Sequence, residues 1–204
     1  MTVVDRMFRR LRYGAPIVVV SGLPRSGTSM AMKMLDAGGL PTLVDGIRTA
    51  DNSNPKGYYE FERVKELDKN GDTAWLADAR GKAVKIISFL LTFLPDTFQY
   101  QVIIMQRDLD EVLASQNKML ASRGESGGTA DDQTMRKAYQ QHLDKVDRFL
   151  RSRRCFTTLR VRYRDAIDNP ALEARRMNEF LGGRLKVEQM AAVADRELYR
   201  NRKA

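Results

Sequence analysis

A glycine-containing loop between an apolar run and a helix-like segment could bind a phosphate or sulfate group. The segment VVVSGLPRSGTSM places Gly22 and Gly27 five residues apart, directly after β-branched apolar residues. A turn of this kind points successive backbone N–H groups inward and adds the positive end of a helix, and both attract anions. Thr28 and Ser29 can add hydroxyl donors, and Arg25 supplies a cation. The segment therefore predicts an anion-binding loop.

This loop lacks the lysine that phosphate loops of ATP- and GTP-hydrolysing proteins place after the second glycine. Thr28 occupies the lysine position, and the cation comes earlier, at Arg25. The magnesium-dependent version needs Lys followed by Ser or Thr at these two positions. The pattern therefore disfavours an ATP-dependent phosphotransferase.

The string GLPRSGTS resembles the 5′-phosphosulfate loop of the P-loop sulfotransferases, and the string NPKGYYE recurs in their bacterial-type members. These enzymes use 3′-phosphoadenosine 5′-phosphosulfate (PAPS) as the sulfuryl donor. The resemblance implies that Arg25 contacts the transferring group and the bridging oxygen. It also implies that the rest of the loop binds the 5′-phosphate, through Pro24, Ser26, Gly27, Thr28 and Ser29.

The stretch YQVIIMQRDLDEVLASQ resembles the second nucleotide-binding element of that family. There, a strand ends in Arg and a helix carries Ser eight positions later, which are Arg107 and Ser115 here. The resemblance implies that this pair binds the 3′-phosphate. An arginine can offer two parallel N–H donors to a phosphate, which suits this role. An ion-paired arginine and an ordinary helix serine are the alternative.

A third stretch, RVRYRDAIDNPALEARRMNEFLG, resembles a late segment of the same family. By that match Tyr163 approaches the adenine, while a tyrosine that only anchors the end of a strand is the open alternative. The resemblance covers about residues 17–182. Two features depart from the family pattern: the C-terminal region lacks a Gly- and Lys-rich loop, and the chain is shorter than typical members.

Transfer of a sulfuryl group needs an in-line nucleophile, charge stabilisation and usually a base. Cytosolic family members use a histidine whose position falls at Ile87 here. Other branches use a carboxylate, for which Asp45 in LVDG and Glu60 in NPKGYYE are the candidates, with Asp45 slightly favoured. Lys85 matches a family lysine that helps hold the sulfuryl group. His142, the only histidine, is expected to be a packed core residue.

The hydrophobic pattern predicts strands that alternate with helices. The expected strands cover 16–21, 83–88, 100–106 and 156–161. The expected helices cover 28–37, 60–69, 108–121, 131–152 and 170–181, with a helical tail from 187. Such alternation favours a three-layer α/β/α fold around a central, mostly parallel sheet, whose ligands bind at the carboxyl ends of the strands. We expect one domain over 1–204, with a basic N-terminal segment at 1–14 and a tail at 184–204.

Composition narrows the class of protein. The 204 residues are 43% apolar and carry a formal net charge of +9, which suits a globular protein with anionic ligands. Cys155 is the only cysteine, in agreement with a reducing compartment, and the sequence contains no apolar run long enough to span a membrane. We therefore expect a cytoplasmic protein. No Cys/His spacing predicts a metal site, and no motif supports nucleic-acid binding.

The sequence thus predicts a PAPS-dependent sulfotransferase that needs no metal. Its acceptor would be a hydroxyl or amine group of a small molecule or glycan, and its product would be 3′-phosphoadenosine 5′-phosphate (PAP). Two alternatives remain. The chain could be a P-loop nucleotide or sugar kinase, or a nucleotide-binding module without catalytic activity.

Overall fold

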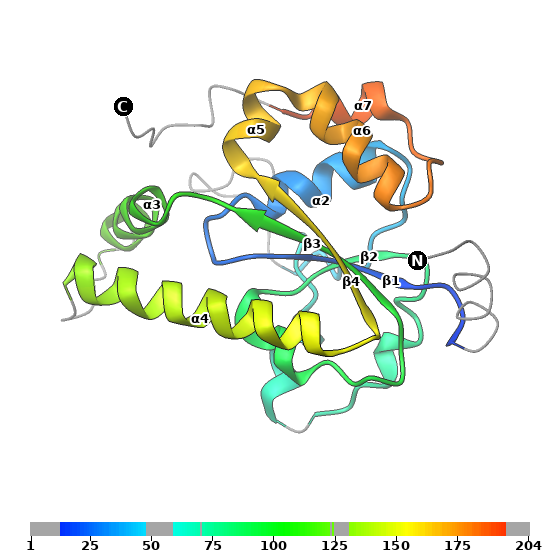
Figure 1. Ribbon diagram of the computed structural model, residues 1–204, viewed down its shortest axis with the longest axis horizontal. Helices are drawn as coiled ribbons and strands as arrows, with labels where there is room; N and C mark the ends of the chain where they lie inside the picture. Colours follow the sequence, from blue (N-terminus) through cyan, green and yellow to red (C-terminus); the bar gives the residue numbers. More distant parts are fainter. Residues whose placement is uncertain (1–12, 48–58, 70, 123, 125–130, 195–204) are drawn as a thin grey trace.

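Four parallel strands form a single sheet in the part of the chain that the structure describes (Figure 1). The computed structural model describes residues 13–47, 59–69, 71–122, 124 and 131–194. The strands are β1 (Ile17–Ser21), β2 (Ala83–Lys85), β3 (Tyr100–Gln106) and β4 (Phe156–Arg162). Their order in the sheet is β2-β1-β3-β4, and every neighbouring pair is parallel. Their carboxyl ends therefore lie along one edge.

Helices cover both faces of the sheet, which confirms the predicted three-layer α/β/α fold (Figure 1). On one face lie α2 (Thr28–Ala37), α5 (Tyr163–Asp168), α6 (Pro170–Phe180) and α7 (Val187–Ala191). On the other lie α4 (Asp132–Ser152) and the 3-10 helices η1 (Glu62–Lys69), η2 (Ala74–Leu76) and η3 (Ser88–Phe93).

The central strand β1 contributes to both hydrophobic cores. Val18 and Val20 pack beneath α2, whereas Ile17 and Val19 pack on the opposite face. Because successive side chains of a strand point to opposite faces, a strand buried on both sides shows no apolar–polar alternation. This explains why the apolar run at 16–21 predicted the strand correctly.

The helix that follows β3 lies at the carboxyl edge of the sheet. This helix, α3 (Leu109–Ser122), begins after Asp108, whose Oδ1 accepts a hydrogen bond of 2.9 Å from the N–H of Asp110. Val112 and Leu113 pack with Leu23 and Tyr139 in a third apolar cluster. The cluster attaches α3 and α4 to the segment that follows β1.

Two predicted elements differ from the structure, and one helix was missed. The strand predicted at 83–88 ends at Lys85, and the chain turns into η3 at Ser88, although the N–H groups of Ile86 and Ser88 still donate to the carbonyls of Val20 and Gly22. The segment predicted as a helix at 60–69 is the 3-10 helix η1, and α5 was not predicted. Residues 1–12 of the basic N-terminal segment and 195–204 of the tail lie outside the described residues.

Candidate functional site

The turn that joins β1 to α2, residues 22–27, is called the glycine loop below. Gly22 has φ 154° and Gly27 has φ 99°, values in a region that disfavours side chains. A Cβ atom at Gly22 would lie 2.4 Å from the Ser26 Oγ, and one at Gly27 would lie 2.3 Å from the Tyr163 ring. Arg25 also has a positive φ, 70°. The two glycines are therefore required by both backbone conformation and close packing.

The glycine loop presents the positive end of α2. This helix has no side-chain cap at its N-terminus and no acidic residue in its first turn. The side chain of Ser26 is 1% exposed, and its Oγ has no hydrogen-bond partner among the described residues. A buried hydroxyl without a partner is unfavourable, and an anion oxygen in the loop would accept a hydrogen bond from it. The loop therefore fits a phosphate or sulfate group.

Arg107 connects the end of β3 to the glycine loop. Its Nη1 donates a hydrogen bond of 3.1 Å to the carbonyl oxygen of Arg25. Its Nε lies 2.9 Å from Glu111 Oε2, and its guanidinium carbon lies 4.6 Å from the centroid of the Tyr163 ring. The Nε of Arg25 in turn donates to Ser115 Oγ at 3.1 Å. The structure thus brings the four residues predicted from the two nucleotide motifs and the late segment into one cluster.

Tyr163 lies inside this cluster rather than on its surface. It follows the last residue of β4 and is 6% exposed. One edge of its ring fits against Gly27, and Arg107 lies over the ring. This position favours the alternative in which Tyr163 supports the loop and the arginine. Its contact with adenine stays a prediction.

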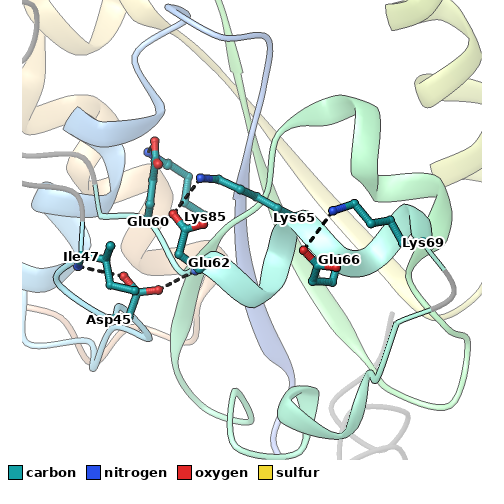
Figure 2. Close-up of polar contacts among 8 residues, drawn as sticks. All are labelled: Asp45, Ile47, Glu60, Glu62, Lys65, Glu66, Lys69 and Lys85. Carbon is teal, nitrogen blue, oxygen red and sulfur yellow. Dashed lines mark hydrogen bonds and ion pairs between the residues drawn. The ribbon is translucent and has the colours of Figure 1, made fainter.

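Lys85 and Glu60 form a largely buried ion pair at the same edge of the sheet. Lys85 ends β2, opposite Val20 of β1. Its Nζ lies 3.3 Å from Glu60 Oε1, and the two side chains are 8% and 17% exposed. Figure 2 shows both side chains converging above the ribbon of the 59–62 segment. The pair therefore places a carboxylate and an ammonium group beside the strand that leads into the glycine loop.

Asp45 has a different environment. Its Oδ1 accepts a hydrogen bond of 3.1 Å from the N–H of Ile47, and its Oδ2 accepts one of 2.5 Å from the N–H of Glu62 (Figure 2). Its own N–H donates to the carbonyl of Glu60 at 3.3 Å. Both carboxylate oxygens of Asp45 thus bind main-chain groups and join its loop to the start of η1. This geometry favours Glu60 as the base, against the slight preference of the sequence for Asp45.

Residues 47–186 match the family model described as "Sulfotransferase family", which is more than half of the chain. The chain belongs to the sulfotransferase family. The match contains Glu60, Lys85, Arg107, Ser115 and Tyr163, but it begins after the glycine loop and Asp45. No curated protein matches the chain.

Two solved sulfotransferase domains have the same fold as this sulfotransferase-family chain. One comes from the curacin biosynthetic pathway and is 14% identical in sequence. The match covers 87% of this chain and 77% of that domain's chain, with a TM-score of 0.53. The other comes from the olefin synthase of Synechococcus PCC 7002 and is also 14% identical. The match covers 93% of this chain and 80% of that domain's chain, with a TM-score of 0.56. At this level of identity the similarity establishes the fold alone.

The sequence reasoning missed two contacts of this family member. Glu111, the ion-pair partner of Arg107, lies four residues after it in the first turn of α3, and this spacing is a signal that could have been used. Ser88 Oγ lies 2.9 Å from His142 Nε2, and the His142 ring stacks on Phe89 at 3.8 Å. His142 is half-buried, and its pKa is lowered by burial and then by the charge of Lys145. No local pattern predicts this contact between η3 and α4.

Two further properties concern only the residues that the structure describes. None of their helices is long and apolar enough to cross a membrane. Their His, Cys, Asp and Glu side chains form no group of three or more that could hold a metal ion.

Proposed function

We propose that this sulfotransferase-family chain transfers a sulfuryl group from PAPS to a hydroxyl or amine acceptor and releases PAP. The observation that supports this most strongly is the direct contact between the two predicted anion sites. Arg25 of the glycine loop binds Ser115, and Arg107 binds the carbonyl of Arg25. An adenosine with phosphate groups at its 5′ and 3′ positions has anions at both ends, which matches two neighbouring cationic sites.

In this proposal the glycine loop binds the 5′ end of the donor. The main-chain amides of the loop and the first turn of α2 would contact the phosphate, together with the hydroxyls of Ser26, Thr28 and Ser29. Arg107 and Ser115 would bind the 3′-phosphate, Arg107 as a charged donor and Ser115 as a neutral one. Ser115 is 6% exposed and lies on α3, so its hydroxyl has a fixed position.

The chemical step is an in-line displacement at sulfur. The acceptor oxygen or nitrogen forms a bond to sulfur while the bond from sulfur to the 5′-phosphate oxygen breaks, and PAP leaves with the bonding electron pair. Arg25 would stabilise the charge that develops on the bridging oxygen. Glu60 would take the proton of the acceptor, and Lys85, 3.3 Å from it, would face the sulfuryl oxygens. Charge neutralisation is thereby assigned to arginine, lysine and main-chain amides.

The acceptor is proposed to be a small molecule or glycan. The described segments that flank the Glu60–Lys85 pair carry exposed apolar side chains, with Ile47 67% and Ile87 36% exposed. These segments, 42–47 and 86–89, are the ones that an acceptor would meet on its way to Glu60.

Calorimetry with PAP and with magnesium-ATP tests the donor. The proposal expects PAP to bind without magnesium and more tightly than magnesium-ATP. If magnesium-ATP binds more tightly and is hydrolysed or used as a phosphate donor, the kinase alternative replaces it. If PAP binds but labelled PAPS transfers no sulfuryl group to any of a panel of alcohols, phenols, amines and sugars, the chain is a binding module.

A further inference from the structure

Glu111 is a buried carboxylate that the proposed transfer reaction does not use. It lies in the first turn of α3, and its side chain is 6% exposed. Its Oε2 pairs with the Nε of Arg107, whose side chain is 9% exposed. Removing two charges from water is unfavourable unless their geometry is good and their other polar atoms are also bonded. A pair buried this deeply at the edge of a binding site therefore fixes the orientation of the arginine.

The guanidinium group transmits that orientation to the glycine loop. A guanidinium is planar and rigid, so a bond at Nε determines where Nη1 points. In Arg107, the Nε faces Glu111 and the Nη1 donates to the carbonyl of Arg25 at 3.1 Å. The ring of Tyr163 lies against the guanidinium, 4.6 Å from its central carbon. Three contacts from three different elements thus define one position for this side chain.

The carbonyl that Arg107 holds belongs to the strained part of the loop. Arg25 has φ 70°, a conformation that a side chain disfavours. The peptide unit after it is planar, so its carbonyl and the N–H of Ser26 point in opposite directions. Arg107 binds that carbonyl, and the N–H of Ser26 donates to the carbonyl of Leu23 at 3.2 Å. This peptide plane is therefore fixed at both ends, and one end depends on Arg107.

We propose that Glu111 is a positioning residue of the glycine loop: through Arg107 it holds the Arg25–Ser26 peptide in the conformation that binds the 5′-phosphate. The choice of ligand rests on the proposed function. The inference goes further because it gives a residue on the 3′-phosphate side of the site an effect at the 5′ side. Loss of Glu111 should then weaken binding of a nucleotide that carries no 3′-phosphate.

Calorimetry with 5′-AMP and with PAP tests this effect. We expect Glu111→Ala to lower the affinity for both nucleotides by about tenfold or more, because Arg107 without its partner no longer holds the Arg25 carbonyl. Glu111→Gln should stay within about threefold of the unchanged protein, because its amide oxygen can still accept from Arg107 Nε. Asp110→Ala is the matched control. Asp110 lies one position before Glu111 on α3 and forms an exposed ion pair with Arg136, so its loss should leave both affinities unchanged.

Amide hydrogen exchange provides a readout that needs no nucleotide. Glu111→Ala should increase exchange in peptides that cover 22–29, but not in those that cover η2, which packs on the opposite face of the sheet from α2. Glu111→Asp keeps the charge and shortens the side chain, so it serves if the alanine variant does not fold; it should give the same changes, smaller in size.

The outcomes separate this inference from the proposed function. If the unchanged protein binds PAP but the Glu111 variants lose affinity for PAP alone, with 5′-AMP affinity and loop exchange unaltered, Glu111 acts only on the 3′-phosphate site and the inference is wrong. If the unchanged protein binds neither nucleotide, the proposed donor is wrong, and the role of Glu111 in nucleotide binding is wrong with it.

Discussion

Arg25 and Ser115 lie 90 residues apart in the chain, yet Arg25 Nε donates a hydrogen bond of 3.1 Å to Ser115 Oγ. The arginine belongs to the glycine loop between β1 and α2, and the serine to α3. The proposed function assigns them to opposite ends of one nucleotide. Substitutions at the two positions should therefore affect different steps, even though the side chains touch.

Arg25→Ala should lower the rate of sulfuryl transfer by about 100- to 1,000-fold, because the charge on the bridging oxygen would lose its stabilising cation. PAP affinity should fall by less than about tenfold, since the main-chain amides of the loop remain. Single-turnover transfer from labelled PAPS and calorimetry with PAP measure the two quantities. A large loss of affinity with an unchanged rate would contradict the role given to Arg25.

Ser115→Ala should lower the affinity for PAP by about three- to tenfold, the effect of losing one neutral hydrogen bond, and leave the affinity for 5′-AMP unchanged. The comparison of the two nucleotides by calorimetry isolates the 3′-phosphate. Ser152→Ala serves as the control, because that hydroxyl only donates to the carbonyl of Phe149 at the end of α4. An equal loss for both nucleotides would assign Ser115 to the structure of the loop instead.

Glu60→Gln should reduce transfer by about 100- to 10,000-fold with little change in PAP affinity, as expected for removal of a general base. Asp45→Asn should behave differently, because both oxygens of Asp45 accept main-chain hydrogen bonds. We expect it to lower the free energy of unfolding by about 1 kcal/mol, because Asn keeps only one of the two acceptor oxygens, and to leave most of the activity. Transfer assays and urea unfolding of both variants provide the test. If Asp45→Asn abolished transfer in a stable protein, the assignment would reverse.

The parts of the site that the sequence predicted depend on local patterns. The β-branched residues of β1 and β3 and the glycines of the loop determine the local structure of the segments that contain them. The bounds of β3 and α2 are therefore as predicted. Arg107 and Ser115 were paired through the resemblance to the family's second nucleotide-binding element, and one strand–helix unit carries both. Parallel strands then bring their carboxyl ends to one edge, and the two motifs meet there.

The remaining features depend on tertiary contacts. The end of β2 is followed by the turn into η3 at Ser88, which no pattern within 83–88 reveals. The choice between Asp45 and Glu60 depends on side-chain directions in an irregular segment, where hydrophobic periodicity gives no information. The approach of the Tyr163 ring to Gly27 likewise joins the end of β4 to the glycine loop, across the sheet.

Gly27→Ala should destabilise the protein by about 2 kcal/mol or more, because the new methyl group would overlap the Tyr163 ring and the residue has φ 99°. Gly39→Ala is a matched control: Gly39 has φ 91°, but a Cβ there would meet nothing within 4 Å, so it adds backbone strain alone. Urea unfolding of both variants separates the two contributions. Equal losses would mean that the ring moves aside at no cost.

His142 should make stability depend on pH near neutrality. Burial and the charge of Lys145 lower its pKa below the usual 6.5, so the folded protein keeps it neutral in a range where the unfolded chain takes up a proton. Acidification then favours the unfolded state, and the stabilisation present above pH 6.5 is lost as the pH falls through the lowered pKa. His142→Gln can still bond Ser88 but does not titrate. We therefore expect the unfolding free energy of the unchanged protein, measured in urea, to fall relative to that of this variant as the pH is lowered from about 7.5 to 5.5. Carboxylates titrate in both proteins and cancel, so a difference that stays constant with pH would contradict the lowered pKa.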